Sequence, residues 1–278
     1  GSASGGGVSN QQDSEALKRY WPSLAIAPDG TIYLTWENSD GEDIEMYAAR
    51  WDGTSWSRLG PDGGNVSRKI GDSATPWIAL APDGSPIITW QDETSGDHEI
   101  YVRRWNGSSW IEVGTGSASG GGISKSIGRS LDPTIATDKS GTPYVTWSDL
   151  SSGNVEVFVR RWSGSAWTEV GSGSAGGAGI SNSAGASWSP RIAFGGSGFP
   201  CITWYDIFAN QAEVYVRCWN GSTWAEAGSG SATGGGVSNN ARASSHPAIA
   251  FDSNETPYVT WGDNSSGNYE IYVKRWTN

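Results

Sequence analysis

A repeat of about 57 residues constrains the fold of this 278-residue chain more than any other feature. Each of five copies contains two tryptophans that stand fifteen positions apart. The five pairs are Trp36/Trp51, Trp90/Trp105, Trp147/Trp162, Trp204/Trp219 and Trp261/Trp276. A period of this size indicates an array of supersecondary units that bury their apolar faces against one another. We therefore expect one domain over residues 1–278, with units at about 8–60, 66–114, 123–171, 180–228 and 237–278.

Each copy predicts four short strands. The first is an apolar run after a proline, as at Pro133–Thr137, and the second is a PYVTW-type segment, as at Pro143–Trp147. The third, Glu99–Trp105, is rich in β-branched and aromatic residues, and the fourth follows the hairpin turn at Asn106-Gly107. Four antiparallel strands repeated radially form the blade of a β-propeller. The sequence therefore predicts an all-β, five-bladed propeller with four-stranded antiparallel blades.

The fifth copy does not match the others at its end. Its third-strand segment is followed only by Trp276-Thr277-Asn278, so we expect the last blade to lack its outer strand. An uncovered strand edge invites pairing with another chain. The sequence therefore predicts a monomer or edge-mediated pairing.

The two faces of such a propeller are unequal. Proline-Asp-Gly and Asn-Gly turns lie on one face, whereas the loops between the second and third strands and the Gly/Ser-rich segments between copies lie on the other. Binding residues tend to lie on longer loops held by a rigid scaffold. We therefore place function on the long-loop face.

The composition excludes several classes of function. Nucleic-acid binding depends on basic residues that neutralise phosphates, whereas this chain has 18 basic and 29 acidic residues and a net charge of −11. Nucleic acid is therefore not an expected partner. No stretch approaches the roughly 18 apolar residues of a membrane-spanning helix, so membrane insertion is not expected. The two histidines, His98 and His246, lie in different copies, which disfavours a His-rich metal site or a Ser/His/Asp triad. We predict no metal, cofactor or catalytic residue.

An acidic residue follows the second strand in four copies. These residues are Asp92, Asp149, Asp206 and Asp263, and Asn38 takes their place in the first copy. They are candidate acceptors for sugar hydroxyls at repeated sites. The alternative is that each side chain caps its own loop by accepting hydrogen bonds from backbone N–H groups, as in Asx turns.

Aromatic residues that differ between copies form the second group of candidates. Trp21, Trp188 and His246 stand just before a first strand, near the expected channel, and Tyr205 follows a second-strand tryptophan. Aromatic faces stack on sugar rings, and their polar edges bind hydroxyls. Together with the four aspartates, these residues are the predicted ligand-binding set.

A glutamate opens the third strand of every copy, as at Glu99 and Glu156, and in four copies a cation follows four positions later, as at Arg103 and Arg160. We interpret both as structural and expect them to pair between neighbouring strands. The two cysteines, Cys201 and Cys218, replace residues of two adjacent strands in the fourth copy. They predict a cross-strand disulfide, with two unpaired thiols as the alternative.

The segments GGGVSNN, PYVTW and EIYVRRWNGSSW resemble the repeats of secreted bacterial β-propeller proteins, most of which have no assigned activity. The resemblance covers all five copies and implies the fold more than a function. By architecture alone, the five copies are also similar to the tachylectin-type lectins, which implies sugar binding between blades. The chain begins within repeat sequence, so we expect a cut through an array and an extracellular or cell-surface protein whose signal peptide is not present here.

The preferred interpretation of the sequence is a non-enzymatic, lectin-like module that binds glycans at several loop sites and gains avidity from the repeat. One alternative is a structural or protein-interaction domain of a larger surface protein. The other is a glycan-active hydrolase or lyase with one site over the channel. The residues that hint at this last alternative are Arg19, Arg129, Arg191, Arg242 and His246.

Overall fold

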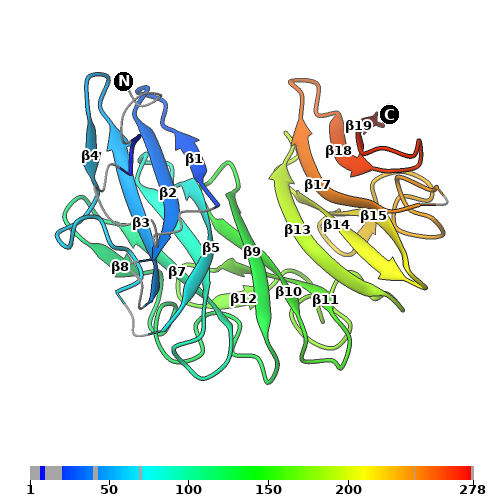
Figure 1. The fold of residues 1–278 in the computed structure, drawn as a ribbon, viewed down its shortest axis with the longest axis horizontal. Coiled ribbons are helices and arrows are strands. Elements are labelled where there is room, and N and C mark those ends of the chain that lie inside the picture. Colours follow the sequence, from blue (N-terminus) through cyan, green and yellow to red (C-terminus); the bar gives the residue numbers. More distant parts are fainter. Residues whose placement is uncertain (1–6, 10–20, 40–42, 69–70, 241, 277–278) are drawn as a thin grey trace.

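The computed structural model describes residues 7–9, 21–39, 43–68, 71–240 and 242–276. These residues form five antiparallel sheets and no helix (Figure 1). The first sheet contains β1 (Ser23–Ile26), β2 (Ile32–Ser39), β3 (Ile44–Trp51) and β4 (Trp56–Arg58), and the second contains β5 (Ser73–Leu80), β6 (Pro86–Asp92), β7 (Glu99–Trp105) and β8 (Trp110–Glu112). The third contains β9 (Ser130–Thr137), β10 (Pro143–Asp149), β11 (Glu156–Trp162) and β12 (Trp167–Glu169). The fourth contains β13 (Ala186–Phe194), β14 (Pro200–Phe208), β15 (Gln211–Trp219) and β16 (Trp224–Glu226), and the fifth contains β17 (Ser244–Phe251), β18 (Pro257–Asp263) and β19 (Glu270–Arg275).

One sheet corresponds to one copy of the repeat. In each sheet the strands pair in sequence order, and the second strand carries the first tryptophan of the repeat. That tryptophan pairs with an aromatic residue of the third strand, as Trp147 does with Phe158 and Trp204 with Tyr215. The predicted all-β architecture of antiparallel, four-stranded sheets is confirmed, with a fifth sheet that has three strands within the described residues.

The core lies between successive sheets. The second-strand tryptophans Trp90, Trp147 and Trp204 are almost completely buried. The indole N–H of Trp110 in β8 donates to the carbonyl of Leu59 at 2.7 Å, which ties the outer strand of the second sheet to the first. Burial of aromatic surface stabilises this packing, and the indole hydrogen bond removes the cost of burying the N–H group.

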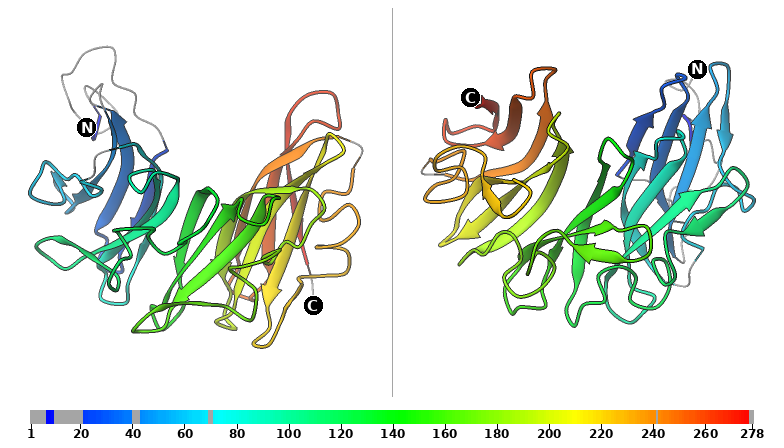
Figure 2. Two further views of the ribbon diagram at one scale, coloured as in Figure 1. Left: turned by 90° about the horizontal axis from the view of Figure 1, so that it is seen from below. Right: turned by 180° about the vertical axis from the view of Figure 1, so that it is seen from behind.

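The five sheets follow one another along an arc. The first strands of successive sheets contact one another, and they lie on the inner side of the arc in Figures 1 and 2. The sheet of β1–β4 and the sheet of β17–β19 lie at the two ends of the arc. Five sheets arranged in this way fit the five predicted blades. Within the described residues, no helix is long and apolar enough to cross a membrane.

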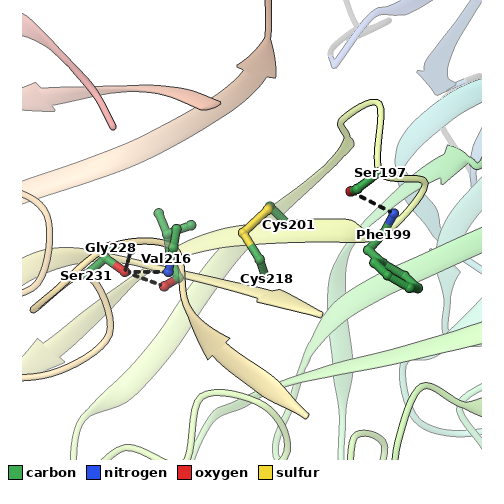
Figure 3. Close-up of a disulfide and its surroundings, with 8 residues drawn as sticks. Ser197, Phe199, Cys201, Val216, Cys218, Gly228 and Ser231 are labelled. Atoms are coloured by element: carbon green, nitrogen blue, oxygen red, sulfur yellow. Dashed lines mark hydrogen bonds between the residues drawn. A yellow bond between two sulfur atoms is a disulfide. The ribbon is translucent and has the colours of Figure 1, made fainter. Parts of the chain in front are cut away.

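The structure joins Cys201 in β14 to Cys218 in β15 by a disulfide (Figure 3). The two residues are direct partners in the β14–β15 register, and their Cα atoms lie 4.0 Å apart. The copies elsewhere carry other residues at these positions, such as Tyr144 and Arg161, which are also direct partners. The bridge therefore reinforces a strand pair that the repeat already forms.

The expected pairing between third-strand glutamates and cations is wrong. Glu99 accepts hydrogen bonds from the hydroxyl of Ser124 and, at 3.1 Å, from the N–H of Ser126. The guanidinium of Arg103 instead donates to the carbonyl of Val66 at 2.5 Å, in the segment that follows the first sheet. The two side chains are structural, but each binds a Gly/Ser-rich segment because that segment runs beside the third strand.

Candidate functional site

One backbone position repeats in all five sheets but carries a different side chain in each. This position precedes the proline of the first strand, and its residue has a positive φ of 50° to 54° in every copy. The five residues are Trp21, Thr75, Asp132, Ser189 and His246. Positive φ is uncommon for residues other than glycine, and such strained positions concentrate at functional sites. The repeat therefore keeps a costly backbone geometry while it varies the chemistry that this geometry presents.

These five residues line one cavity of about 110 Å³. Three prolines, Trp77 and Arg191 complete its wall, so every sheet contributes to it. In the second to fifth sheets this position coincides with a register shift between the first and second strands, for example between Ala74 and Trp77. The cavity therefore lies where the inner strands of the five sheets begin, on the long-loop face.

Asp132 is the carboxylate in the wall of this cavity. Burial raises its pKa, whereas the positive charge of Arg191, a hydrogen bond from Ser189 and the neighbouring His246 act in the opposite direction. The hydroxyl of Ser189 donates to Asp132 Oδ2 at 3.3 Å. The Arg191 guanidinium carbon lies 4.8 Å from the centre of the Trp77 ring, which fixes the cation over an aromatic face. The acid thus lies in a desolvated site beside a positioned cation.

A second carboxylate, Glu37, lies just beneath the cavity wall. It is buried, and burial raises its pKa. Its Oε2 accepts a hydrogen bond from the N–H of Thr75 at 3.2 Å. The Thr75 hydroxyl donates to Gln91 Oε1 at 3.1 Å, and the same oxygen accepts the N–H of Asp132 at 2.9 Å. Glu37 is therefore bonded to the backbone of Thr75, and Gln91 links the Thr75 hydroxyl to the backbone of Asp132.

Aromatic groups lie around the cavity that holds Asp132. The Tyr205 and His246 ring centroids lie 6.0 Å apart, and His246 Nδ1 is hydrogen-bonded to the Ser245 hydroxyl at 2.9 Å. Trp21 is exposed at the rim of the cavity. Burial raises the pKa of Tyr205. Flat aromatic faces next to hydrogen-bonding groups are suited to a sugar ring.

The structure brings some of the predicted site residues together and separates others. Trp21 and His246 line the cavity, and the Tyr205 ring lies tilted beside the His246 ring. Trp188 pairs with Tyr205 across β13 and β14. Among the arginines proposed for a hydrolase, Arg191 lines the cavity, whereas Arg129 and Arg242 are exposed. Arg19 lies outside the described residues.

The four repeated aspartates are buried between strand and loop. Asp92, Asp149, Asp206 and Asp263 each accept the indole N–H of the tryptophan two positions earlier and the hydroxyl of a first-strand serine. Asp92, Asp149 and Asp263 also accept a backbone N–H of the following loop. This geometry is the one described by the loop-capping alternative, while a role for these residues in ligand binding stays a prediction.

Sequence reasoning missed Asp132, Glu37 and the contribution of Thr75. The available signal was divergence: the positions before the first-strand proline and after the second-strand tryptophan differ in every copy. The residues after that tryptophan are Glu37, Gln91, Ser148, Tyr205 and Gly262. Such positions mark where the copies of the repeat differ in the chemistry of their side chains.

No protein-family pattern and no curated protein sequence matches the chain. Solved structures do match it. A protein of unknown function from Dyadobacter fermentans superposes with a TM-score of 0.59 at 11% identity, over 95% of this chain and 80% of that one. An α-L-arabinanase from Penicillium chrysogenum, complexed with arabinobiose, matches with a TM-score of 0.57 at 14% identity, over 91% and 80%. A GH93 α-L-arabinofuranosidase of Fusarium graminearum, also with arabinobiose, matches with a TM-score of 0.52 at 11% identity, over 95% and 95%.

These neighbours show the fold and correct the functional interpretation. The prediction of a non-enzymatic, multivalent lectin-like module is wrong, because the structures that share this fold include an arabinanase and an arabinofuranosidase. The chain itself agrees with this correction. Its differentiated side chains gather in one central cavity and are not spread over five equivalent loop sites.

Proposed function

We propose that the protein is a glycoside hydrolase with a single active site at the cavity where the five sheets converge. The observation that carries the proposal is Asp132 in the wall of an aromatic-rimmed cavity, together with Glu37 behind that wall, where it accepts the N–H of the lining residue Thr75; burial raises the pKa of both carboxylates. Most glycosidases cleave the glycosidic bond with two such carboxyl groups, one as general acid and the other as base or nucleophile. The similar arabinanase and arabinofuranosidase support arabinofuranosyl oligosaccharides as the first substrates to test.

The surroundings of the two carboxylates assign their roles. The ionised form of Asp132 is favoured by Arg191, Ser189 and His246, which suits a base or nucleophile. Burial is the main cause of the raised pKa of Glu37; the hydrogen bond from the Thr75 N–H acts against it, and the charge of Asp72 raises the pKa further. No cation acts on Glu37 among these causes, so we assign it as the proton donor and Asp132, which has Arg191 beside it, as the base or nucleophile. Trp21 and Trp77 would hold the sugar ring, and Arg191 would remain fixed beside Asp132.

The same proposal includes a five-bladed propeller that closes as a ring and a glycan as its binding partner. We also propose an extracellular or cell-surface location. The disulfide between Cys201 and Cys218 supports that location, because disulfides persist in oxidising compartments.

The test is hydrolysis of a panel of arabino-oligosaccharides, arabinan and other plant glycans, followed by chromatography of the released sugars. Asp132→Asn and Glu37→Gln are each expected to lower the rate at least about 100-fold, which is the low end of acid–base contributions. The matched controls are Asp97→Asn and Glu93→Gln, two exposed acids of the loop between β6 and β7, which are expected to keep full activity. Hydrolysis that survives both cavity substitutions would contradict the assignment of the site. Absence of hydrolysis on every glycan would contradict the proposed function.

A further inference from the structure

The third strand of the fifth sheet is exposed, although its counterparts are buried. All six residues of β19 are exposed, and Ile271 has 80% of its surface accessible. The equivalent residues of the other four sheets are 0% exposed: Met46, Ile100, Val157 and Val214. A strand whose apolar positions face solvent only in one of five copies is missing a covering element that the others possess.

The covering element in the other sheets is the Gly/Ser-rich segment that follows the outer strand. In the second sheet the N–H of Ile123 donates to the carbonyl of Ile100 at 2.7 Å, and the N–H of Ile100 donates to the hydroxyl of Ser124 at 2.8 Å. The first, third and fourth sheets repeat the first bond at 2.6–2.8 Å, in the pairs Val66/Met46, Ile180/Val157 and Val237/Val214. In every case a β-branched residue and a serine seal the third strand.

Residues 7–9 have the sequence and backbone of that covering element. Gly7-Val8-Ser9 matches Gly122-Ile123-Ser124 and Gly236-Val237-Ser238. Gly7 has a φ of +66°, close to +58° at Gly122 and +65° at Gly236. In the second, third and fourth sheets a glycine with positive φ stands there, and a Cβ on Gly122 would lie 2.1 Å from the carbonyl oxygen of Ile100; the first sheet has Asn65 at this place. Gly7 therefore has the residue type and backbone conformation of the glycines that lie against the third strand in those three sheets.

The first sheet already holds this segment from the other side. In the later sheets a third-strand cation reaches back to the segment of the preceding sheet, as Arg103 does to the carbonyl of Val66. The first sheet has Ala49 at that position, but its strand partner Arg58 donates to the carbonyl of Ser9 at 2.5 Å. The Arg58 guanidinium also lies 4.6 Å from the centre of the Trp36 ring. The contact that normally links one sheet to the previous one is thus made to residues 7–9.

We propose that residues 7–9 are a latch that closes the ring by covering β19 of the same chain. Val8 packs on Ile271 and its N–H donates to the carbonyl of Ile271, while the hydroxyl of Ser9 binds Glu270. Arg58 holds the opposite side of the latch against the first sheet. The latch joins the two ends of the arc, from which Trp21 and His246 enter the central cavity. The inference concerns closure of the fold and does not depend on hydrolytic activity.

Thiol cross-linking tests whether the latch acts within one chain. The full chain carrying Ser9→Cys and Glu270→Cys is treated with a short bismaleimide and run on a non-reducing gel, so that the native disulfide stays closed. The pair Ser238→Cys and Glu213→Cys is the positive control, because its side chains are in contact in the fourth sheet. A cross-link within the monomer is the expected result. A covalent dimer would overturn the proposal in favour of a second copy's segment, and no cross-link alongside a successful control would overturn it as well.

Hydrogen exchange provides an independent readout on the protein without new cysteines. Val8→Asp is expected to increase the exchange rate of the β19 amides at least 10-fold while leaving β10 and β11 unchanged. The matched control is Ile127→Asp, which adds the same charge at a loop side chain that is 93% exposed. Unchanged exchange in β19 upon Val8→Asp would overturn the latch.

Discussion

Replacement of Asp149 by alanine should destabilise the fold strongly. Asp149 is 1% exposed and accepts the indole N–H of Trp147 and the hydroxyl of Ser130, both at 2.9 Å, and the N–H of Ser151 at 2.9 Å. Trp147 and Ser130 are 0% exposed, so Asp149→Ala leaves two buried donors that water does not reach. An unsatisfied buried donor costs about 1–3 kcal/mol, which gives a loss of about 4 kcal/mol in the free energy of unfolding.

Urea unfolding followed by tryptophan fluorescence measures this loss, with midpoint and slope compared between variants. Asp149→Asn keeps one acceptor oxygen and should lose about half as much. The control is Asp138→Ala in the turn between β9 and β10, where the carboxylate accepts the N–H groups of Ser140 and Thr142 near solvent. Because water replaces those bonds, the control should lose less than about 1 kcal/mol. A loss for Asp149→Ala no larger than that of the control would refute the loop-capping argument for the repeated aspartates.

Three further predictions concern charge, the cavity and the disulfide. Burial raises the pKa of Asp263, but hydrogen bonds from Ser265, Ser244 and Trp261 outweigh this effect and hold the pKa at about 2. The ionised Asp263 carboxylate therefore contributes its full stabilisation above about pH 4, and this stabilisation is lost as the pH falls through about 2. Between these pH values the free energy of unfolding should fall by at most about 2 kcal/mol because of Asp263, and Asp263→Asn should remove this decrease. Equal pH profiles of unfolding for the two proteins would contradict a lowered pKa of Asp263. Arg191→Ala should raise the pKa of Asp132, so the acidic limb of the pH–rate profile moves to higher pH, while Arg191→Lys restores part of the shift; a limb that stays in place would exclude Asp132 as the ionised group. Replacing both Cys201 and Cys218 by serine should lower stability by about 3 kcal/mol, from the loop entropy of a 17-residue separation, and reducing agent should then have no further effect on unfolding, in contrast to the wild-type chain.

The elements of the fold were predictable from the sequence because their causes are local and repeated. Alternating β-branched and aromatic residues form the second and third strands, and Asn106-Gly107 forms a tight turn. Because the PYVTW-type segment recurs in the five copies, each copy supports the strand prediction made from the others. The pairing of Cys201 with Cys218 follows from the same register.

The candidate site was only partly predictable. Trp21, Tyr205 and His246 could be predicted as site residues because they are aromatic residues that differ from the other copies of the repeat. Asp132 could not be distinguished by sequence from the other acidic residues of the chain. Glu37 was overlooked because its partner, Thr75, belongs to the next copy. The electrostatic environment of a side chain depends on its neighbours in space, and the spacing within one copy does not contain that information.

The sequence alone determined the strands, their grouping into five sheets and the unequal faces, since hydrogen bonding and side-chain alternation act over a few residues. Only the tertiary structure decided which of the divergent residues meet. Trp21, Asp132 and His246 belong to three different sheets, and they share one cavity because the inner strands converge where each begins. Convergence also buries Asp132 beside Arg191 and His246, and burial raises the pKa of Asp132 there.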